Sequence, residues 1–282
     1  MRNLLSANFY SLKRSRVFWG CEIVCALYAA FLSCEIYMDM KYNGYAHPLD
    51  TGLFQFVVFS GIILSVFCSL YLGSELGDGI VRNKVVAGHR KSHIYLAAFL
   101  VCGAASVLFT LTYLAIYLMI SVPLLLPLQA DAATAALVLF SSLLLAFAYC
   151  GIFTLISLLS TNKAVVSTVC VILAFLLFMT GIAIKQRLDE PEVFEIVEYD
   201  EETRDGVPTG EMIPNNSYLA PSVRRTVYEF LNDFLPGSQG LQLSGMMEPE
   251  LTFNRRLPLY SLSIIVLTTG MGLMIFRKKD LT

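Results

Sequence analysis

The sequence predicts an all-α, polytopic membrane protein with six transmembrane helices. Hydrophobic residues make up 56% of its 282 residues and charged residues only 15%, whereas soluble domains usually carry about 25% charged residues. The apolar residues also gather in nearly uncharged runs of about 20 residues, the length that a helix needs to cross a bilayer. A membrane β-barrel would instead show short segments of alternating hydrophobicity, and we find none in the sequence.

The first 16 residues form a short segment with apolar residues at helical spacing. Leu5, Phe9 and Leu12 fall on one face, and three cations precede the first apolar run. This pattern is typical of an N-terminal helix that lies in the membrane interface. A plain charged tail before the first span is the alternative.

The first apolar run, residues 17–36, is longer than the core of a signal peptide, so we expect an uncleaved first span. The other runs cover residues 53–72, 94–122, 132–159, 164–184 and 258–276. The third and fourth exceed the length of a single crossing, so we expect these helices to tilt or protrude. Pro123 and Pro127 would end the third helix.

Lysine and arginine indicate which side of the membrane each loop faces. If the N-terminus is cytoplasmic, twelve cations lie on that side, whereas the short opposite loops 37–52 and 123–131 contain only Lys41. The twelve are Arg2, Lys13, Arg14, Arg16, Arg82, Lys84, Arg90, Lys91, Lys163, Arg277, Lys278 and Lys279. The asymmetry predicts a multi-pass membrane protein with both termini in the cytoplasm.

Three regions follow from this topology. Residues 1–184 contain the N-terminal helix, spans one to five and a charged loop, 73–93, while residues 257–282 contain span six and a cytoplasmic tail. Residues 185–256 form one large external segment. Its acidic part, Asp189–Glu211, contains proline and glycine residues that we expect to prevent regular structure. Residues 222–235 predict an amphipathic helix that ends before Pro236, and its apolar face needs a partner.

The motifs of several enzyme classes are absent from the sequence. It contains no HExxH, no GxSxG and no phosphate-binding GxxxxGK[ST] loop. The seven cysteines lie in or beside apolar runs without metal-binding spacing, so we interpret them as small packing residues. We therefore expect no catalytic residues, no metal, no cofactor and no nucleic-acid partner.

Glu22 is the only acidic residue well inside a predicted span. Ionisable residues in a membrane are expensive and usually functional. One interpretation is a carboxylate near the interface that is hydrogen-bonded, or paired with Arg16 or Lys13. The other is a polar contact in a translocation path.

The loop Glu75–Tyr95 is a charged segment between two long apolar runs. A single cation from this loop would cost roughly 3 kcal/mol at mid-bilayer, so the loop belongs to the aqueous side. Gly77 and Gly79 allow a sharp exit from the second span, and Gly88 would end a short helix. The loop predicts a helix on the membrane surface. Its charges could serve only as a topological anchor, or they could bind a partner.

This loop resembles the first cytoplasmic loop of the type-2 ABC transporter permeases, which are six-span bacterial membrane subunits. The similar positions are Glu75, Asp78, Gly79, Arg82, Asn83, Lys84, Gly88, Arg90, Ile94 and Tyr95. The runs Pro214–Tyr218 and Arg225–Pro236, with Gln239, resemble a subset of these permeases, and Phe276–Leu281 is similar to their common C-terminus. The resemblance covers essentially the whole chain, and the acidic stretch 189–205 departs from it.

The resemblance implies an exporter in which two permeases, identical or different, work with two copies of a separate ATPase subunit. The loop would be a coupling helix that docks on the ATPase, and ATP hydrolysis would take place on that other chain. The implied docking and hinge positions are Glu75, Asp78, Arg82, Asn83, Lys84 and Arg90. The substrate path would run between the permeases along spans one, two and five, under an external cap formed by the segment before span six.

A second function class stays open on the sequence. The chain could be a non-transporting membrane scaffold or sensor that binds a partner through its acidic external segment.

Overall fold

The computed structural model describes residues 2–160, 162–199, 206–246 and 253–279. Six helices in this part of the chain are long and apolar enough to cross a membrane. They are α2 (Arg16–Asn43), α4 (Phe56–Gly77) with the short α3 (Asp50–Leu53) before it, α6 (Lys91–Ser121), α7 (Ala132–Ser157), α8 (Lys163–Asp189) and α11 (Arg256–Lys278). The predicted all-α, multi-pass class is confirmed.

Most helix ends lie within a few residues of the predicted ends, and the exceptions are the ends of α2, α4 and α8. The apolar run ends at residue 36, but α2 continues to Asn43. Gly44 then adopts a left-handed φ of 76° and donates its N–H to the carbonyl of Met40, which ends the helix. The apolar run therefore marks the part of α2 that suits lipid, while the helix itself continues beyond it.

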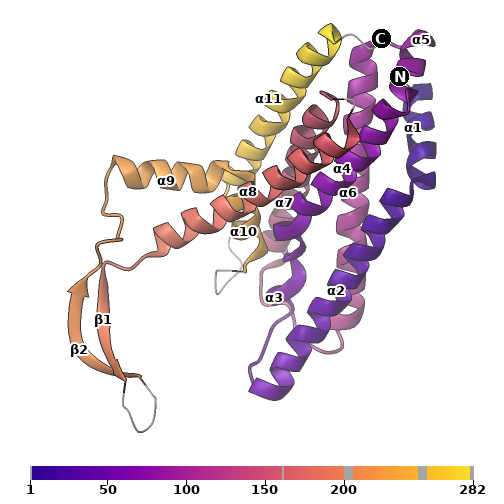
Figure 1. Cartoon of the computed structure of the whole chain (residues 1–282). Coiled ribbons are helices and arrows are strands. Elements are labelled where there is room, and N and C mark those ends of the chain that lie inside the picture. Colours follow the sequence, from indigo (N-terminus) through magenta and orange to yellow (C-terminus); the bar gives the residue numbers. More distant parts are fainter. Residues whose placement is uncertain (1, 161, 200–205, 247–252, 280–282) are drawn as a thin grey trace.

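One end of the bundle carries both chain termini, α1 (Arg2–Arg14) and α5 (Ile80–Val86) (Figure 1). The start of α6 and the end of α11 lie there too. We call this the basic end, because it gathers Lys13, Arg14, Arg16, Arg82, Lys84, Arg90, Lys91, Lys163, Arg277, Lys278 and Lys279. The short α3 lies toward the opposite end.

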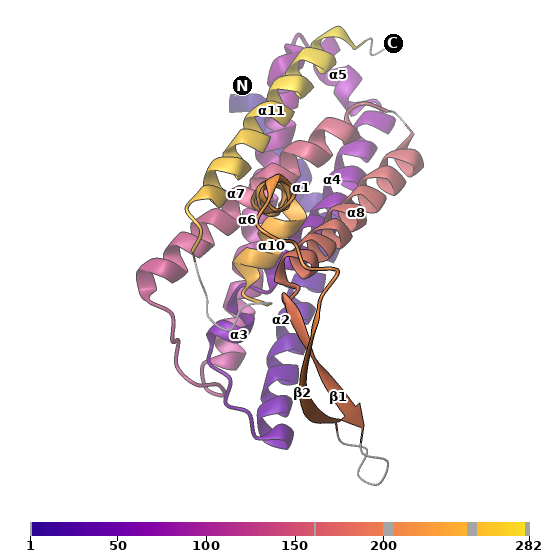
Figure 2. The ribbon, with the colours of Figure 1, turned by 90° about the vertical axis from the view of Figure 1, so that its left-hand side faces the viewer.

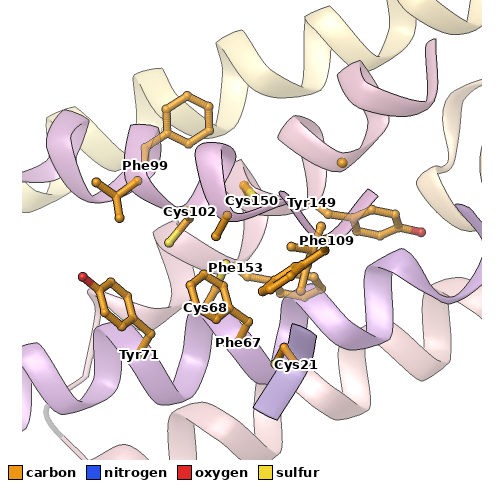
Figure 3. Packing of buried hydrophobic residues seen from close by; sticks show 14 of the residues in the cluster. Cys21, Phe67, Cys68, Tyr71, Phe99, Cys102, Phe109, Tyr149, Cys150 and Phe153 are labelled. Atoms are coloured by element: carbon orange, nitrogen blue, oxygen red, sulfur yellow. The ribbon is translucent and has the colours of Figure 1, made fainter. Parts of the chain in front are cut away.

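The core between α4, α6 and α7 is built from aromatic side chains and cysteines (Figure 3). Phe67 stacks on Tyr71 with ring centroids 5.4 Å apart and meets Phe109 edge-to-face at 5.3 Å. Cys68, Cys102 and Cys150, one from each helix, are fully buried free thiols. They serve as small packing residues, as the sequence indicated.

The acidic part of the external segment forms a β-hairpin, so the expectation that it lacks regular structure is wrong. Strand β1 (Val193–Tyr199) pairs antiparallel with β2 (Gly206–Pro214), with Val193 opposite Pro214. The run Val193–Val197 is rich in β-branched and aromatic residues, which favour strands. Residues 200–205, part of the acidic stretch, lie outside the described residues. The hairpin projects away from the bundle (Figures 1 and 2).

The predicted amphipathic helix is confirmed as α9 (Val223–Phe234), and its N-cap is Ser222, whose hydroxyl accepts the N–H of Arg225. Phe230 and Phe234 pack edge-to-face on Tyr260 of α11, with ring centroids 5.8 Å apart. The start of α11 is therefore one partner of the apolar face of α9.

A second helix, α10 (Pro236–Ser244), follows at once and was not predicted. Pro236 ends α9 but occupies the first turn of α10, where its missing N–H costs nothing. Helix α10 packs against α4, α7 and α8 and is almost entirely buried (Figure 2). A Cβ atom on Gly237 would lie 1.9 Å from the carbonyl oxygen of Leu177 in α8, so only glycine permits this crossing.

Candidate functional site

The charged loop at the basic end forms a tight turn followed by a short helix. Helix α4 ends at Gly77, and Gly79 adopts a left-handed φ of 73° directly before α5. This conformation favours glycine, because a Cβ atom would be strained there. The predicted surface helix thus exists as α5, and Val81 anchors it with a side chain that is only 1% exposed.

Glu75 and Lys84 form a buried ion pair inside this loop. The Lys84 ammonium lies 2.8 Å from the Glu75 carboxylate, and the Glu75 residue is 4% exposed. Lys84 also donates to the side-chain oxygen of Asn8, at 2.8 Å, and the hydroxyl of Tyr71 donates to the Asn8 carbonyl at 3.2 Å. We call these residues the Asn8 cluster. It joins α1, α4 and α5 at one point.

The Asn8 cluster explains which face of α1 is buried. The sequence predicted Leu5, Phe9 and Leu12 as the apolar face. The buried residues are instead Leu4, Asn8 and Leu12, whereas Phe9 is exposed. Asn8 takes a buried position because both its side-chain and backbone oxygens find donors there, which offsets the cost of burying an amide.

Asp78 makes an exposed contact with a different part of the basic end. Its carboxylate accepts a 2.6 Å hydrogen bond from Lys163, the first residue of α8. The Lys163 side chain passes over Gly77, where a Cβ atom would come within 2.4 Å of it. The turn before α5 is therefore linked to the start of the fifth span.

The outer face of α5 has no partner within the described chain. Arg82 and Asn83 are exposed, Ile80 is half-exposed, and Val86 is 80% exposed. This face therefore presents apolar and polar side chains together. Buried Val81 and Lys84 occupy the inner face, so the helix is held on one side and open on the other.

Arg90 lies apart from this surface. It precedes α6 and borders a separate hollow together with Lys91, Ser92 and Arg277. The structure therefore divides the predicted residues into a buried pair (Glu75 and Lys84), a linked turn (Asp78), an open face (Arg82 and Asn83) and a cation that borders a separate hollow (Arg90).

Glu22 lies in α2, away from the loop. Its side chain lies near Thr112 of α6. One carboxylate oxygen, Oε2, is buried and has no hydrogen-bond partner in the part of the chain that the structure describes. The expected pairing with Arg16 or Lys13 is not formed, because the carboxylate faces α6.

The sequence did not identify three partners of the site: Asn8, Tyr71 and Lys163. Asn8 and Lys84 are 76 residues apart, and Lys163 and Asp78 are 85 apart, so no local pattern connects them. The polar Asn8 within an apolar helical face was the one available signal. Among the described residues, no cluster of three or more His, Cys, Asp or Glu is arranged to hold a metal ion.

Comparison with known proteins does not assign the chain, because no family model and no curated protein matches it.

Proposed function

We propose that the chain is the permease subunit of an ATP-driven ABC exporter and that α5 is its coupling helix. One observation carries the proposal: α5 is fixed to the membrane helices on its inner face and open on its outer face. A helix held in this way can bind another chain on its outer face and pass the movement of that chain to the membrane helices through its inner face. The sequence lacks a phosphate-binding loop, so ATP hydrolysis would take place on the partner, and this chain would not be an enzyme.

The contacts of α5 give the proposed coupling three routes. A displacement of α5 would reach α4 through Glu75, α1 through Asn8, and α8 through the Asp78–Lys163 pair. The buried pair and Asn8 would act as the hinge, while Arg82 and Asn83 would form the docking surface. This division refines the single set of coupling positions that the resemblance implied.

The proposed orientation places the basic end in the cytoplasm of a bacterium, at its plasma membrane. The excess of lysine and arginine there supports this orientation, and it would put both termini and α5 on the side that supplies ATP. Helices α2, α8 and α11 bury the smallest shares of their surface within the chain. Their open faces would contact lipid and a second permease.

Co-purification with ABC-type ATPases expressed from the same genome tests the proposal. The double variant Arg82→Glu/Val86→Glu should abolish the complex, because both side chains are exposed on the outer face of α5. The matched variant Arg224→Glu changes an exposed cation on α9 and should leave the complex intact. Equal recovery of the ATPase with both variants would overturn the assignment of α5.

The second candidate function, a scaffold or sensor, is favoured by the projecting β-hairpin. Its strands expose Phe194, Met212 and Ile213, which could bind an external partner. Deletion of residues 193–214 distinguishes the two functions. A permease should still bind its ATPase after this deletion, whereas a sensor would lose its external partner and would have no ATPase to bind.

A further inference from the structure

A hollow at the basic end is lined almost entirely by cations. Its volume is about 540 Å³, and its lining residues are Arg90, Lys91, Ser92 and Arg277. This volume falls in the range of small-molecule sites, about 300–1,000 Å³. In the described part of the chain, no carboxylate pairs with Arg90, Lys91 or Arg277. The hollow therefore presents positive charge that the described fold leaves uncompensated.

The Lys91 ammonium is partly engaged, because it donates to the backbone carbonyl of Lys279. That bond fixes the end of α11 beside the start of α6 and so holds Arg277 near Arg90. The Lys279 ammonium in turn donates to the carbonyl of Leu158, at 2.8 Å. The hollow is thus built on a fixed junction of three helices.

A second hollow of about 510 Å³ adjoins the first, since Arg277 lines both. Met274 and Lys278 complete its lining. Leu267, Met271, Met274 and Lys278 follow one another at spacings of four, three and four residues, so they share one face of α11. The three apolar members are exposed. An apolar stripe therefore runs along a transmembrane helix and ends at a group of cations.

We propose that this junction binds an anionic phospholipid, with the phosphate headgroup among Arg90, Lys91 and Arg277 and an acyl chain along Leu267, Met271 and Met274. Basic hollows between transmembrane helices at the membrane surface recognise anionic headgroups. Arginine is suited to this task because its guanidinium can donate two parallel hydrogen bonds to a phosphate. A free phosphate would use the cations but not the apolar stripe. The proposal does not depend on the proposed transport function.

Binding of fluorescent phosphatidylglycerol and fluorescent phosphatidylcholine to the purified full chain in neutral detergent tests this site. Each cation near a membrane surface strengthens anionic-lipid binding by about fivefold. We therefore expect Arg90→Gln/Arg277→Gln to weaken phosphatidylglycerol binding by more than about tenfold and to leave phosphatidylcholine unchanged. Arg14→Gln/Arg16→Gln removes two cations of the same end that do not line the hollow, and it should bind like the parent chain.

Three outcomes would overturn the proposal. Equal binding of both lipids by the parent chain would show that the hollow does not select anionic lipid. Equal weakening by both double variants would show that general surface charge, not the hollow, attracts the lipid. Displacement of phosphatidylglycerol by millimolar inorganic phosphate would show that the hollow binds a free anion rather than a lipid. A third variant, Met274→Gln, adds no charge and leaves Arg90 and Arg277 in place. It should weaken phosphatidylglycerol binding, and unchanged binding would contradict the role of the apolar stripe.

Discussion

The Asn8 cluster and the crossing of α8 with α10 hold this bundle together by opposite means. At the basic end, polar side chains from three helices meet at a buried ion pair. At the crossing, the helices meet because Gly181 and Gly237 have no side chains. The first junction depends on charge and hydrogen bonds, and the second depends on the absence of side chains where the two helices touch. A junction held by paired polar groups can be redesigned as a unit, whereas a backbone contact tolerates no added atom.

The largest expected effect is on the Asn8 cluster. Lys84→Ala leaves the Glu75 carboxylate buried without its cation, which should reduce the free energy of unfolding by about 3–5 kcal/mol. The measurement is the unfolding temperature in detergent, followed by the reaction of a thiol dye with the buried cysteines.

The triple variant Asn8→Leu/Glu75→Leu/Lys84→Met is the control for charge. It replaces the pair and the Asn8 amide that Lys84 satisfies with apolar groups, and it should recover most of the lost stability, since a buried pair adds little over good apolar packing. An unfolding temperature for Lys84→Ala equal to that of the parent chain would mean that the pair is not a structural junction.

The second-largest effect on stability is expected at the crossing of α8 and α10. Gly237→Ala places a Cβ atom against the carbonyl of Leu177, and the resulting overpacking should cost about 3 kcal/mol. The same assay measures it. Gly270→Ala is the matched control, because nothing lies within 4 Å of a Cβ atom at that position of α11. It should stabilise the chain by about 0.5–1 kcal/mol, because glycine lowers helix stability. Similar effects of the two substitutions would argue against the tight crossing.

The smallest effect is expected for the exposed pair at the basic end. Asp78 and Lys163 are both about half exposed. Exposed ion pairs contribute about 0.2–1 kcal/mol, so Asp78→Ala should change the unfolding temperature only slightly. A double-mutant cycle with Lys163→Ala isolates the interaction of the two side chains. A coupling energy as large as that of the Glu75–Lys84 pair would remove the distinction between buried and exposed contacts at this end.

The sequence predicted the six spans and α9 because the signals for these elements are local. Apolar runs mark the spans, and α9 has Ser222 at its start and an apolar stripe along its length. The hairpin was missed although its first strand carries a β-branched and aromatic run. The proline and glycine residues near it predict irregular structure, but Gly206 begins β2, and Gly210, with a φ of 77°, lies where the register of the two strands shifts.

The unpredicted parts of the site depend on distant partners. Nothing near Asn8 indicates that its side chain will meet Lys84, and nothing near Glu22 indicates that it will face Thr112. Helix α10 carries little apolar periodicity, and its glycines lower its intrinsic helix stability. It forms because α4, α7 and α8 surround it. Tertiary packing, not local preference, decides such elements.

The proposed coupling requires that the outer face of α5 receives the force of an ATPase. ATP hydrolysis by the ATPase alone and by its complex with this chain in lipid vesicles tests this contact most directly. We expect the parent chain to change the rate of hydrolysis and Arg82→Glu/Val86→Glu to return it to the rate of the ATPase alone, with an unchanged unfolding temperature. Hydrolysis at the rate of the parent complex in the presence of this variant would show that the outer face of α5 does not couple to the ATPase.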